Sequence, residues 1–456
     1  MGLSNREYDG HQCDSVCPMT LSAHVGSAGV GKTHCLVEAL AQSEKVQPLT
    51  EGQRVLALSF MHGSRQRLEG RLRRAPGLKG RYRCMTVDRF AWELCTRWRT
   101  LLREALGTEL REGNFEATCD AAGMLLENAQ VRQWVARSYP KVIVDEAQDL
   151  TLPRLRMMRA LESSVVMMAA ADEFQCLQSD MKPNPAVRWL HDKCAPVELT
   201  VQRRTFRPEL IAAAIAIRNG EALAILSKVT DKEPFARIDK LSLAIAPGKS
   251  PFKFASACVS GAIAWNAAKE IAIITPGRGD FSNMIVEQVS TEKQGKKGTG
   301  PFAVQWERSD ESVVDETFAM LGLPADGSIA ATLAALNDPG MSPAVDICRA
   351  SLSRHRSLTG CEVFTPELVR KHLGAAFSRQ RRFGNRSGSR IKAMTVHQAK
   401  NREFEGVIVL WPFTATGTPE HQRRLLYNAI TRAQRWCTIV VQSRDMLKKP
   451  PFVAEV

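Results

Sequence analysis

A glycine-rich run that ends in lysine and threonine has the residue types needed to bind a nucleoside triphosphate. Residues 26–33 read GSAGVGKT and fit the pattern G-x-x-x-x-G-K-[ST]. In such a loop the glycines let backbone N–H groups wrap the phosphates, Lys32 reaches the β and γ oxygens, and the Thr33 hydroxyl binds Mg²⁺ at a helix N-terminus. The predicted nucleotide site therefore comprises Gly26, Ser27, Ala28, Gly29, Val30, Gly31, Lys32 and Thr33.

Two adjacent carboxylates supply the second part of a phosphoryl-transfer site. Residues 142–149 read VIVDEAQD, so an apolar strand delivers Asp145 and Glu146 at its C-terminal end, where ligands bind in open α/β sheets. We expect Asp145 to hold Mg²⁺ and Glu146 to orient and deprotonate the attacking water. Together with the glycine-rich loop, this pattern predicts a site for ATP and Mg²⁺.

Short apolar runs alternate with helical patterns along much of the chain. Continuous runs rich in Val and Ile are typical of strands that are buried on both faces of a parallel sheet, and alternation with helices indicates α/β units. The runs form an early and a late cluster, which predicts two parallel α/β sheets, each with a small helical insertion. The predicted strands lie at 21–25, 55–58, 142–144, 165–171, 271–274, 407–410 and 438–441.

Composition limits the class of protein and its partners. The chain has 456 residues and a formal net charge of +14, which favours a polyanion such as nucleic acid as partner. It has no apolar run long enough to span a membrane and no secretory signal in residues 1–20, so we expect no membrane association and a cytoplasmic location, at the nucleoid if the cell is bacterial. Cys13 and Cys17, near His11 and His24, match no strong zinc pattern, and a partly ordered tail is the favoured interpretation.

The order of further motifs resembles that of UvrD/Rep-like DNA helicases of superfamily 1, in a compact form. LSFMH at 58–62 and TVDRF at 86–90 resemble motif Ia and the short motif that follows it, and the run ADEFQ at 171–175 resembles motif III. LTVQRRT at 199–205 resembles motif IV. MTVHQAKNREF at 394–404 and RLLYNAITRA at 424–433 are close to motifs V and VI.

This resemblance implies roles for residues far from the glycine-rich loop. Gln175 is implied to sense the γ-phosphate, Arg204 and Arg432 to be arginine fingers that reach the γ-phosphate across a closing cleft, and Glu403 to contribute to nucleotide binding. Nucleic acid is expected to contact residues at the other motif positions through hydroxyl, imidazole and aromatic groups. These residues are Ser59, Phe60, Thr86, Thr395 and His397.

The domain division expected from these patterns interrupts each sheet once. The first RecA-like domain comprises 1–95 and 138–200, with a helical insertion at 96–137. The second comprises 201–303 and 388–456, with a small helical insertion at 304–387.

Several positions depart from the family pattern. Arg203 stands where family members place a tyrosine before the motif IV arginine, and no glutamine motif for adenine precedes the glycine-rich loop. Gln178 and Asp180 stand where the family has base-stacking aromatic residues, and Asn401 stands where glycine is usual in motif V.

The favoured function is ATP hydrolysis coupled to movement along single-stranded or partly single-stranded DNA, as a helicase or translocase with the 3′ to 5′ polarity that the resemblance implies. One alternative is an ATPase subunit of a repair, nuclease or phage-defence complex that unwinds little alone, with a nuclease or repair factor as protein partner. Another is a non-catalytic, nucleotide-gated nucleic-acid clamp. Motif spacing does not separate DNA from RNA, because recognition of the 2′-hydroxyl depends on contact geometry.

Overall fold

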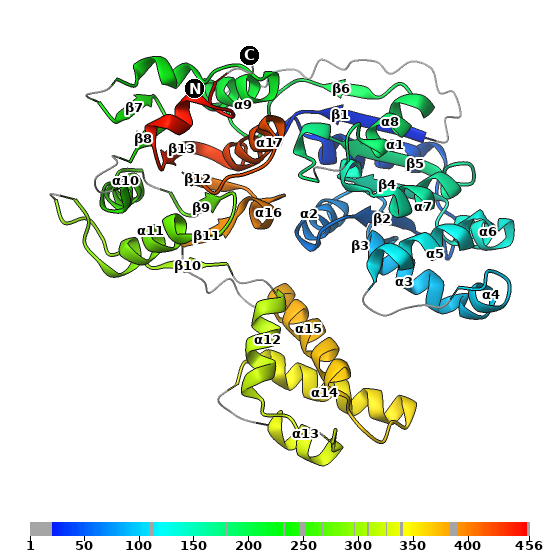
Figure 1. Cartoon of the computed structure of the whole chain (residues 1–456). Coiled ribbons are helices and arrows are strands. Elements are labelled where there is room, and N and C mark those ends of the chain that lie inside the picture. Colours follow the sequence, from blue (N-terminus) through cyan, green and yellow to red (C-terminus); the bar gives the residue numbers. More distant parts are fainter. Residues whose placement is uncertain are drawn as a thin grey trace, which may run out of the picture.

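Two sheets lie side by side, and a group of helices projects from the second (Figure 1). The computed structural model describes residues 21–108, 114–178, 181–230, 233–246, 251–266, 268–295, 297–307, 310–324, 326–337, 341–383 and 390–453. The two sheets formed by these residues have six and seven strands.

The first sheet has six strands in the order β3-β2-β4-β5-β1-β6, and every pairing in it is parallel. Its strands are β1 (Leu21–Gly26), β2 (Val55–Ser59), β3 (Tyr82–Thr86), β4 (Lys141–Asp145), β5 (Val166–Ala171) and β6 (Val197–Leu199). The central strands β2 and β4 are buried along their whole length, which explains their continuous apolar sequences.

Helices cover both faces of this sheet. They are α1 (Lys32–Val46), α2 (His62–Leu72), α3 (Val87–Arg97), α7 (Leu152–Glu162) and α8 (Pro185–Lys193), with short 3₁₀ turns η1 (Ala147–Asp149) and η2 (Glu173–Gln175). One core, which includes Leu36 and Leu68, lies under α1 and α2, and another, which includes Leu94 and Trp189, lies under the helices of the opposite face.

The segment expected to form the first insertion contains α4 (Arg99–Glu104), α5 (Phe115–Glu127) and α6 (Ala129–Ser138). Leu102, Leu125 and Val135 from these helices are buried in the same core as the strands of the first sheet. The described helices therefore extend that core rather than enclosing one of their own. The division of this segment as a separate insertion stays a prediction.

The second sheet has seven strands in the order β10-β11-β9-β12-β13-β8-β7. They are β7 (Phe235–Ile238), β8 (Leu241–Ile245), β9 (Ile271–Thr275), β10 (Val304–Trp306), β11 (Ile391–Thr395), β12 (Phe404–Trp411) and β13 (Ala433–Val441). All pairings are parallel except that of β7 with β8, which form an antiparallel hairpin through a two-residue connection. The second sheet is therefore parallel except at this edge, because so short a connection permits only antiparallel pairing.

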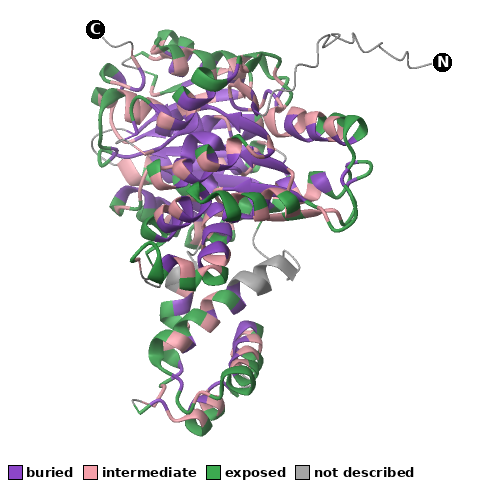
Figure 2. Cartoon of the chain, turned by 90° about the vertical axis from the view of Figure 1, so that its right-hand side faces the viewer, coloured by how far each residue is buried: buried purple, intermediate pink, exposed green. Residues whose placement is uncertain are grey.

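Helices also cover both faces of the second sheet. They are α9 (Pro208–Asn219), α10 (Pro251–Trp265), α11 (Asp280–Thr291), α16 (Val396–Ala399) and α17 (Pro419–Ile430), with 3₁₀ turns η3 (Ala224–Lys228) and η4 (Arg444–Lys448). Figure 2 shows the strands as the buried interior and exposed residues on the outer helices. The fold is thus α/β with two RecA-like domains, as predicted.

A helical group is inserted between the neighbouring strands β10 and β11. It consists of α12 (Asp310–Met320), α13 (Ile329–Ala335), α14 (Pro343–Thr359) and α15 (Pro366–Phe383). Its core, which includes Leu352, Phe364 and Leu373, is separate from the cores of the sheets. Its helices project from the second sheet in Figure 1, and Lys371 of α15 lies 5.7 Å from the ring centroid of Trp92 in α3.

The apolar runs identified in the sequence all overlap observed strands, so those predictions are confirmed. The strands missed include β3 and β6, whose residues are largely exposed or half-buried and whose sequences therefore lack a continuous apolar run.

Candidate nucleotide site between the two domains

The glycine-rich loop leaves β1 and enters α1 at Lys32. Gly29 and Gly31 have φ angles of 88° and 93°, in a region that favours glycine. A Cβ on Gly29 would lie 2.6 Å from Gln202 Oε1, so a side chain there would also collide with the segment that joins the two domains. The loop conformation therefore depends on the glycines of the motif.

Lys32 is held inside the loop by two backbone oxygens. Its Nζ donates to the carbonyls of Gly26 and Ser27, both at 2.9 Å, and lies 3.7 Å from Asp172 Oδ2. Burial lowers the pKa of Lys32, although Asp172 and Glu146 oppose this shift. In this position the ammonium group lies close to the loop amides that are expected to bind phosphate, and its hydrogen bonds go mainly to neutral carbonyl oxygens. It can therefore exchange these bonds for bonds to the phosphates of an incoming nucleotide.

The side chains of Thr33 and Asp145 lie in contact. The Thr33 hydroxyl lies 3.2 Å from each carboxylate oxygen of Asp145, at the C-terminal end of β4. Burial and the neighbouring Glu146 raise the pKa of Asp145 to about 6. These oxygen donors are the ligands that Mg²⁺ prefers, and a divalent cation would relieve the repulsion between the two carboxylates. Thr33 and Asp145 would therefore hold a magnesium ion, which would supply positive charge beside the phosphates.

Glu146 has a backbone conformation unusual for its residue type, with φ 60°. Its Oε2 accepts a hydrogen bond from Gln148 Nε2 at 2.7 Å, and Gln148 Oε1 accepts from the backbone N–H of Asp172 at 2.9 Å. Burial opposes ionisation of Glu146, but Lys32, Lys400 and the Gln148 bond outweigh it and lower its pKa. A carboxylate that stays ionised and is oriented in this way can accept a proton from water.

Arg204 comes from the segment that links the two domains. Its Nε donates to Glu403 Oε1 at 3.0 Å and one NH group donates to the Thr431 carbonyl at 2.8 Å. The Cβ atom of Arg204 lies 2.9 Å from the position that a Cβ on Gly29 would occupy, so the side chain begins beside the glycine-rich loop. Glu403 also pairs with Arg67 of α2 at 3.6 Å. Glu403 of motif V therefore links the second domain to the segment between the domains and to α2 of the first domain.

Arg432 is a buried cation with 1% of its surface exposed. Its Nε donates to the Asn428 carbonyl at 2.8 Å, and its NH2 group lies 3.4 Å from the Thr431 hydroxyl. Burial, with repulsion from Arg204 and Arg67, lowers its pKa to about 9. No carboxylate within the described ranges forms an ion pair with Arg432, so a phosphate would supply the charge that it lacks.

The site thus combines groups from both domains and from the segment between them. Lys32, Asp145 and Glu146 come from the first domain. The charge of Arg204 in the linking segment acts on Lys32, and the charge of Arg432 in the second domain acts on Glu146. Gln175 is buried at the end of η2, whose N-cap residue is Asp172. Its γ-phosphate role, like the other residue roles expected from the sequence, stays a prediction.

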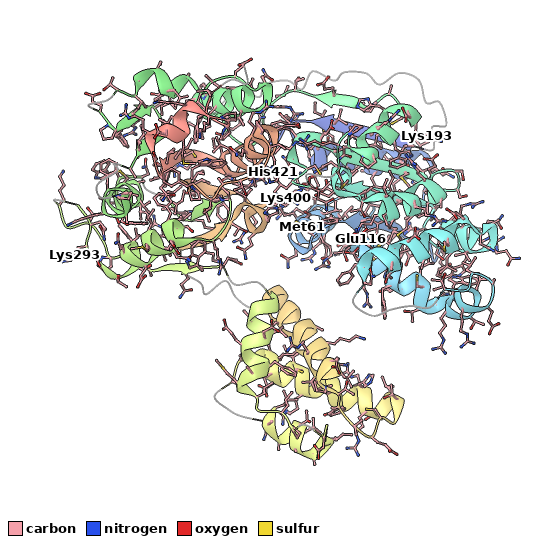
Figure 3. The ribbon with its side chains drawn as sticks, viewed as in Figure 1. Met61, Glu116, Lys193, Lys293, Lys400 and His421 are labelled. Atoms are coloured by element: carbon pink, nitrogen blue, oxygen red, sulfur yellow. The ribbon has the colours of Figure 1, made fainter. Side chains whose placement is uncertain are left out.

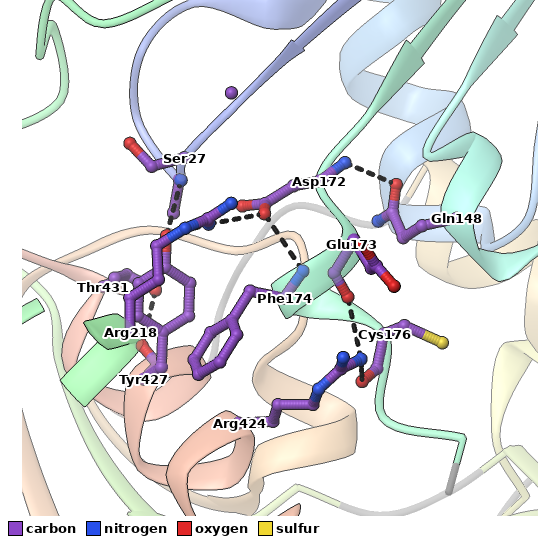
Figure 4. Close-up of polar contacts among 12 residues, drawn as sticks. Ser27, Gln148, Asp172, Glu173, Phe174, Cys176, Arg218, Arg424, Tyr427 and Thr431 are labelled. Carbon is purple, nitrogen blue, oxygen red and sulfur yellow. Dashed lines mark hydrogen bonds and ion pairs between the residues drawn. The ribbon is translucent and has the colours of Figure 1, made fainter. Parts of the chain in front are cut away.

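A second polar network, which sequence patterns did not predict, joins motif III to α17 (Figure 4). Arg424 of α17 donates to the carbonyls of Glu173 and Cys176, at 2.8 and 3.1 Å. The Phe174 ring packs edge-on against Tyr427 with centroids 5.0 Å apart. The Tyr427 hydroxyl in turn accepts a hydrogen bond from the backbone N–H of Ala28 at 2.8 Å. Motif VI therefore touches the glycine-rich loop directly.

The residues expected to bind nucleic acid differ in accessibility. Ser59 is fully buried, and its hydroxyl has no hydrogen-bond partner in the described part of the chain. Thr86 and Thr395 cap α3 and α16 by accepting from backbone N–H groups. Phe60 is half-buried, with the Arg154 guanidinium 5.2 Å from its ring centroid, and His397 is exposed. Contact of these residues with nucleic acid stays a prediction.

Within the described ranges, no group of three or more His, Cys, Asp or Glu residues could hold a metal ion by itself. Cys13 and Cys17 lie outside the described residues, as does Asp180. No described helix is long and apolar enough to cross a membrane.

The two RecA-like sheets and the arrangement of these residues at their boundary are typical of a P-loop NTPase. Residues 12–179 match the model of an AAA domain, and residues 391–440 match that of the UvrD-like helicase C-terminal domain. Together these matches confirm the resemblance to UvrD-like helicases of superfamily 1, a family of DNA helicases that hydrolyse ATP. No curated protein matches the chain.

Proposed function

We propose that this protein hydrolyses ATP with Mg²⁺ and uses the energy to move along single-stranded DNA in the 3′ to 5′ direction. The observation that carries the proposal is the placement of Arg432, a buried cation of the second domain without a described ion-pair partner, whose charge acts on Glu146 of the first domain. Such a cation stabilises the transferring phosphoryl group only when both domains close on the nucleotide. Hydrolysis and domain movement are then coupled.

The net charge of +14 supports nucleic acid as the track, because phosphate neutralisation releases counterions. The polarity comes from the family resemblance alone. Substrates with a 3′ or a 5′ single-stranded tail test it, since a 3′ to 5′ motor separates only the substrate on whose 3′ tail it loads.

The first experiment is steady-state ATP hydrolysis by wild type and Glu146→Gln, each with and without single-stranded DNA or RNA, at low and moderate salt. We expect stimulation by DNA in the wild type and a loss of about 10²–10⁴-fold in the variant, the range typical of a removed general base. Glu51→Gln, at an exposed glutamate after α1, is the matched control and keeps full activity. Absence of hydrolysis under every condition would contradict the proposal and favour a nucleotide-gated clamp.

A second candidate is a translocating ATPase subunit that separates strands only within a larger assembly. Gln178 in place of a base-stacking aromatic residue favours it, because stacking contributes about 1–3 kcal/mol per base to the grip on a single strand. DNA-stimulated hydrolysis without strand separation on either tailed substrate would support this candidate over an autonomous helicase.

A further inference from the structure

Asp172 occupies the boundary between the two domains, directly after β5. Its side chain is 0% exposed. Oδ1 accepts from the backbone N–H of Phe174 at 3.2 Å and from an NH group of Arg218 at 2.7 Å. Oδ2 has no hydrogen-bond partner among the described residues and lies 3.7 Å from Lys32 Nζ. Two cations from different domains therefore share one buried carboxylate.

Arg218 reaches Asp172 from the last turn of α9 in the second domain, as Figure 4 shows. Its guanidinium lies 5.6 Å from the centroid of the Phe174 ring and 6.0 Å from that of Tyr427, and one NH group is 3.5 Å from the Tyr427 hydroxyl. The aromatic rings thus frame the cation and direct it toward Asp172. Nothing in the spacing of the sequence motifs indicated a role for this arginine.

We propose that Arg218 is a positioning residue that neutralises Asp172 and thereby leaves the P-loop lysine, Lys32, free to bind the nucleotide phosphates. A buried carboxylate without a counter-ion is strongly unfavourable, so it attracts whichever cation lies nearest. With Arg218 in place, Oδ1 of Asp172 is paired with a cation, and Lys32 Nζ stays 3.7 Å from Oδ2 and bonded to the loop carbonyls. Without Arg218, Lys32 becomes the only nearby described cation and is drawn away from the phosphates.

The position of the ion pair links this effect to domain movement. Asp172 belongs to the first domain and Arg218 to the second, so opening of the cleft separates them. Asp172 then competes for Lys32 and weakens the hold on the nucleotide, whereas closure restores it. This inference rests on the proposed ATPase function and adds a residue through which closure acts on the phosphate site.

The test is a double-mutant cycle on Arg218 and Asp172 in the full chain. Asp172→Asn removes the charge and keeps the carbonyl oxygen that accepts from Phe174, because asparagine caps as well as aspartate. Equilibrium binding of a fluorescent, non-hydrolysable ATP analogue is measured for wild type, Arg218→Ala, Asp172→Asn and the double variant, with KM and kcat for ATP in parallel.

We expect Arg218→Ala to weaken analogue binding about tenfold and to raise KM more than it lowers kcat. In the Asp172→Asn background the same change should alter binding by less than about twofold, because the charge that captures Lys32 is gone. Arg218→Lys, which keeps the charge, should restore most of the affinity. Arg207→Ala, at an exposed arginine before the same helix, is the control and leaves affinity unchanged.

Equal losses in both backgrounds would overturn the inference, since a purely packing role of Arg218 does not depend on the charge of Asp172. Unchanged binding in Arg218→Ala would overturn it as well. If Arg218→Ala does not fold, Arg218→Gln is compared in the two backgrounds by the same criterion. A wild-type protein that binds no nucleotide would contradict the proposed function. If the wild type hydrolyses ATP and Arg218→Ala binds the analogue equally well, only this inference is contradicted.

Discussion

Lys400 Nζ lies 2.6 and 2.7 Å from the two carboxylate oxygens of Asp149, and the pair joins the two RecA-like domains. The side chains are only 6% and 3% exposed. Figure 3 shows Lys400 at the boundary between the domains. Burial raises the pKa of Asp149 even though Lys400 acts in the opposite sense, and the charge of Lys400 also helps to keep Glu146 ionised. The pair therefore connects motif V to the turn that carries the candidate base.

Lys400→Met should destabilise the contact between the domains, because it leaves the buried Asp149 without a counter-ion, a change that typically costs about 3–5 kcal/mol. The measurement is the thermal unfolding midpoint at pH 7.5, together with DNA-stimulated ATP hydrolysis. The folded protein holds a proton on this carboxyl more readily than the unfolded chain does, so the loss of stability shrinks as the pH is lowered. The double variant Lys400→Met/Asp149→Asn is the matched control, because it removes both charges. An unfolding midpoint of the double variant as low as that of Lys400→Met would contradict this account.

Asn401 should tolerate glycine better than alanine. Its φ is 64°, a conformation that asparagine and glycine adopt more readily than other residues, and its side-chain amide donates to the Ser64 hydroxyl across the domain boundary. Asn401→Ala loses both features and is expected to lower stability by about 1–2 kcal/mol. Asn401→Gly keeps the backbone and loses only the bond. Thermal unfolding of the two variants and of Ser64→Ala separates the effects, and equal melting of Asn401→Ala and wild type would refute the strain argument.

Gly406→Ala should disrupt the second sheet. A Cβ at this position in β12 would lie 2.1 Å from the Trp436 ring, which is itself buried. Overpacking of this kind typically costs about 1–3 kcal/mol, so the unfolding midpoint should fall. Gly261→Ala is the control, because a Cβ there meets no atom within 4 Å and alanine favours the helix α10. A midpoint for Gly406→Ala at or above that of Gly261→Ala would exclude the predicted collision.

Magnesium dependence should change with pH in a defined direction. Burial and Glu146 raise the pKa of Asp145 to about 6, and Mg²⁺ binds only the deprotonated carboxyl. A proton therefore competes with the metal as the pH is lowered through this value, and the Mg²⁺ concentration for half-maximal hydrolysis should rise about fourfold between pH 7.5 and 5.5. Titration of Mg²⁺ at saturating ATP measures this half-maximal concentration. In Asp145→Asn, which has no carboxyl at this position, the half-maximal concentration should no longer change with pH. A constant Mg²⁺ requirement across this range would contradict the assignment of Asp145.

The strands and the two local motifs were predictable because each depends on neighbouring residues. A glycine-rich loop between β1 and α1 presents consecutive backbone amides, and β4 places Asp145 and Glu146 together by chain continuity alone. Strands β2 and β4 were recognisable because burial on both faces selects an unbroken apolar run.

Accessibility at the motif positions was not predictable in the same way. Ser59 and Thr86 carry hydroxyls at positions expected to meet nucleic acid, yet packing buries Ser59 and local geometry engages Thr86 as a helix cap. A motif specifies the order of residue types along the chain, whereas exposure is decided by what packs on the element afterwards.

By itself the sequence determined the two α/β domains, the glycine-rich loop and the paired carboxylates. Only the tertiary structure decided the partners across the domain boundary: Arg218 for Asp172, Lys400 for Asp149, and the Ser64 hydroxyl for Asn401. It also placed Asn401 in a conformation that glycine shares. The physical reason is that charge pairing and hydrogen bonding act over a few ångströms in space, and no local spacing rule reports which distant segments the packing of two sheets brings within that range.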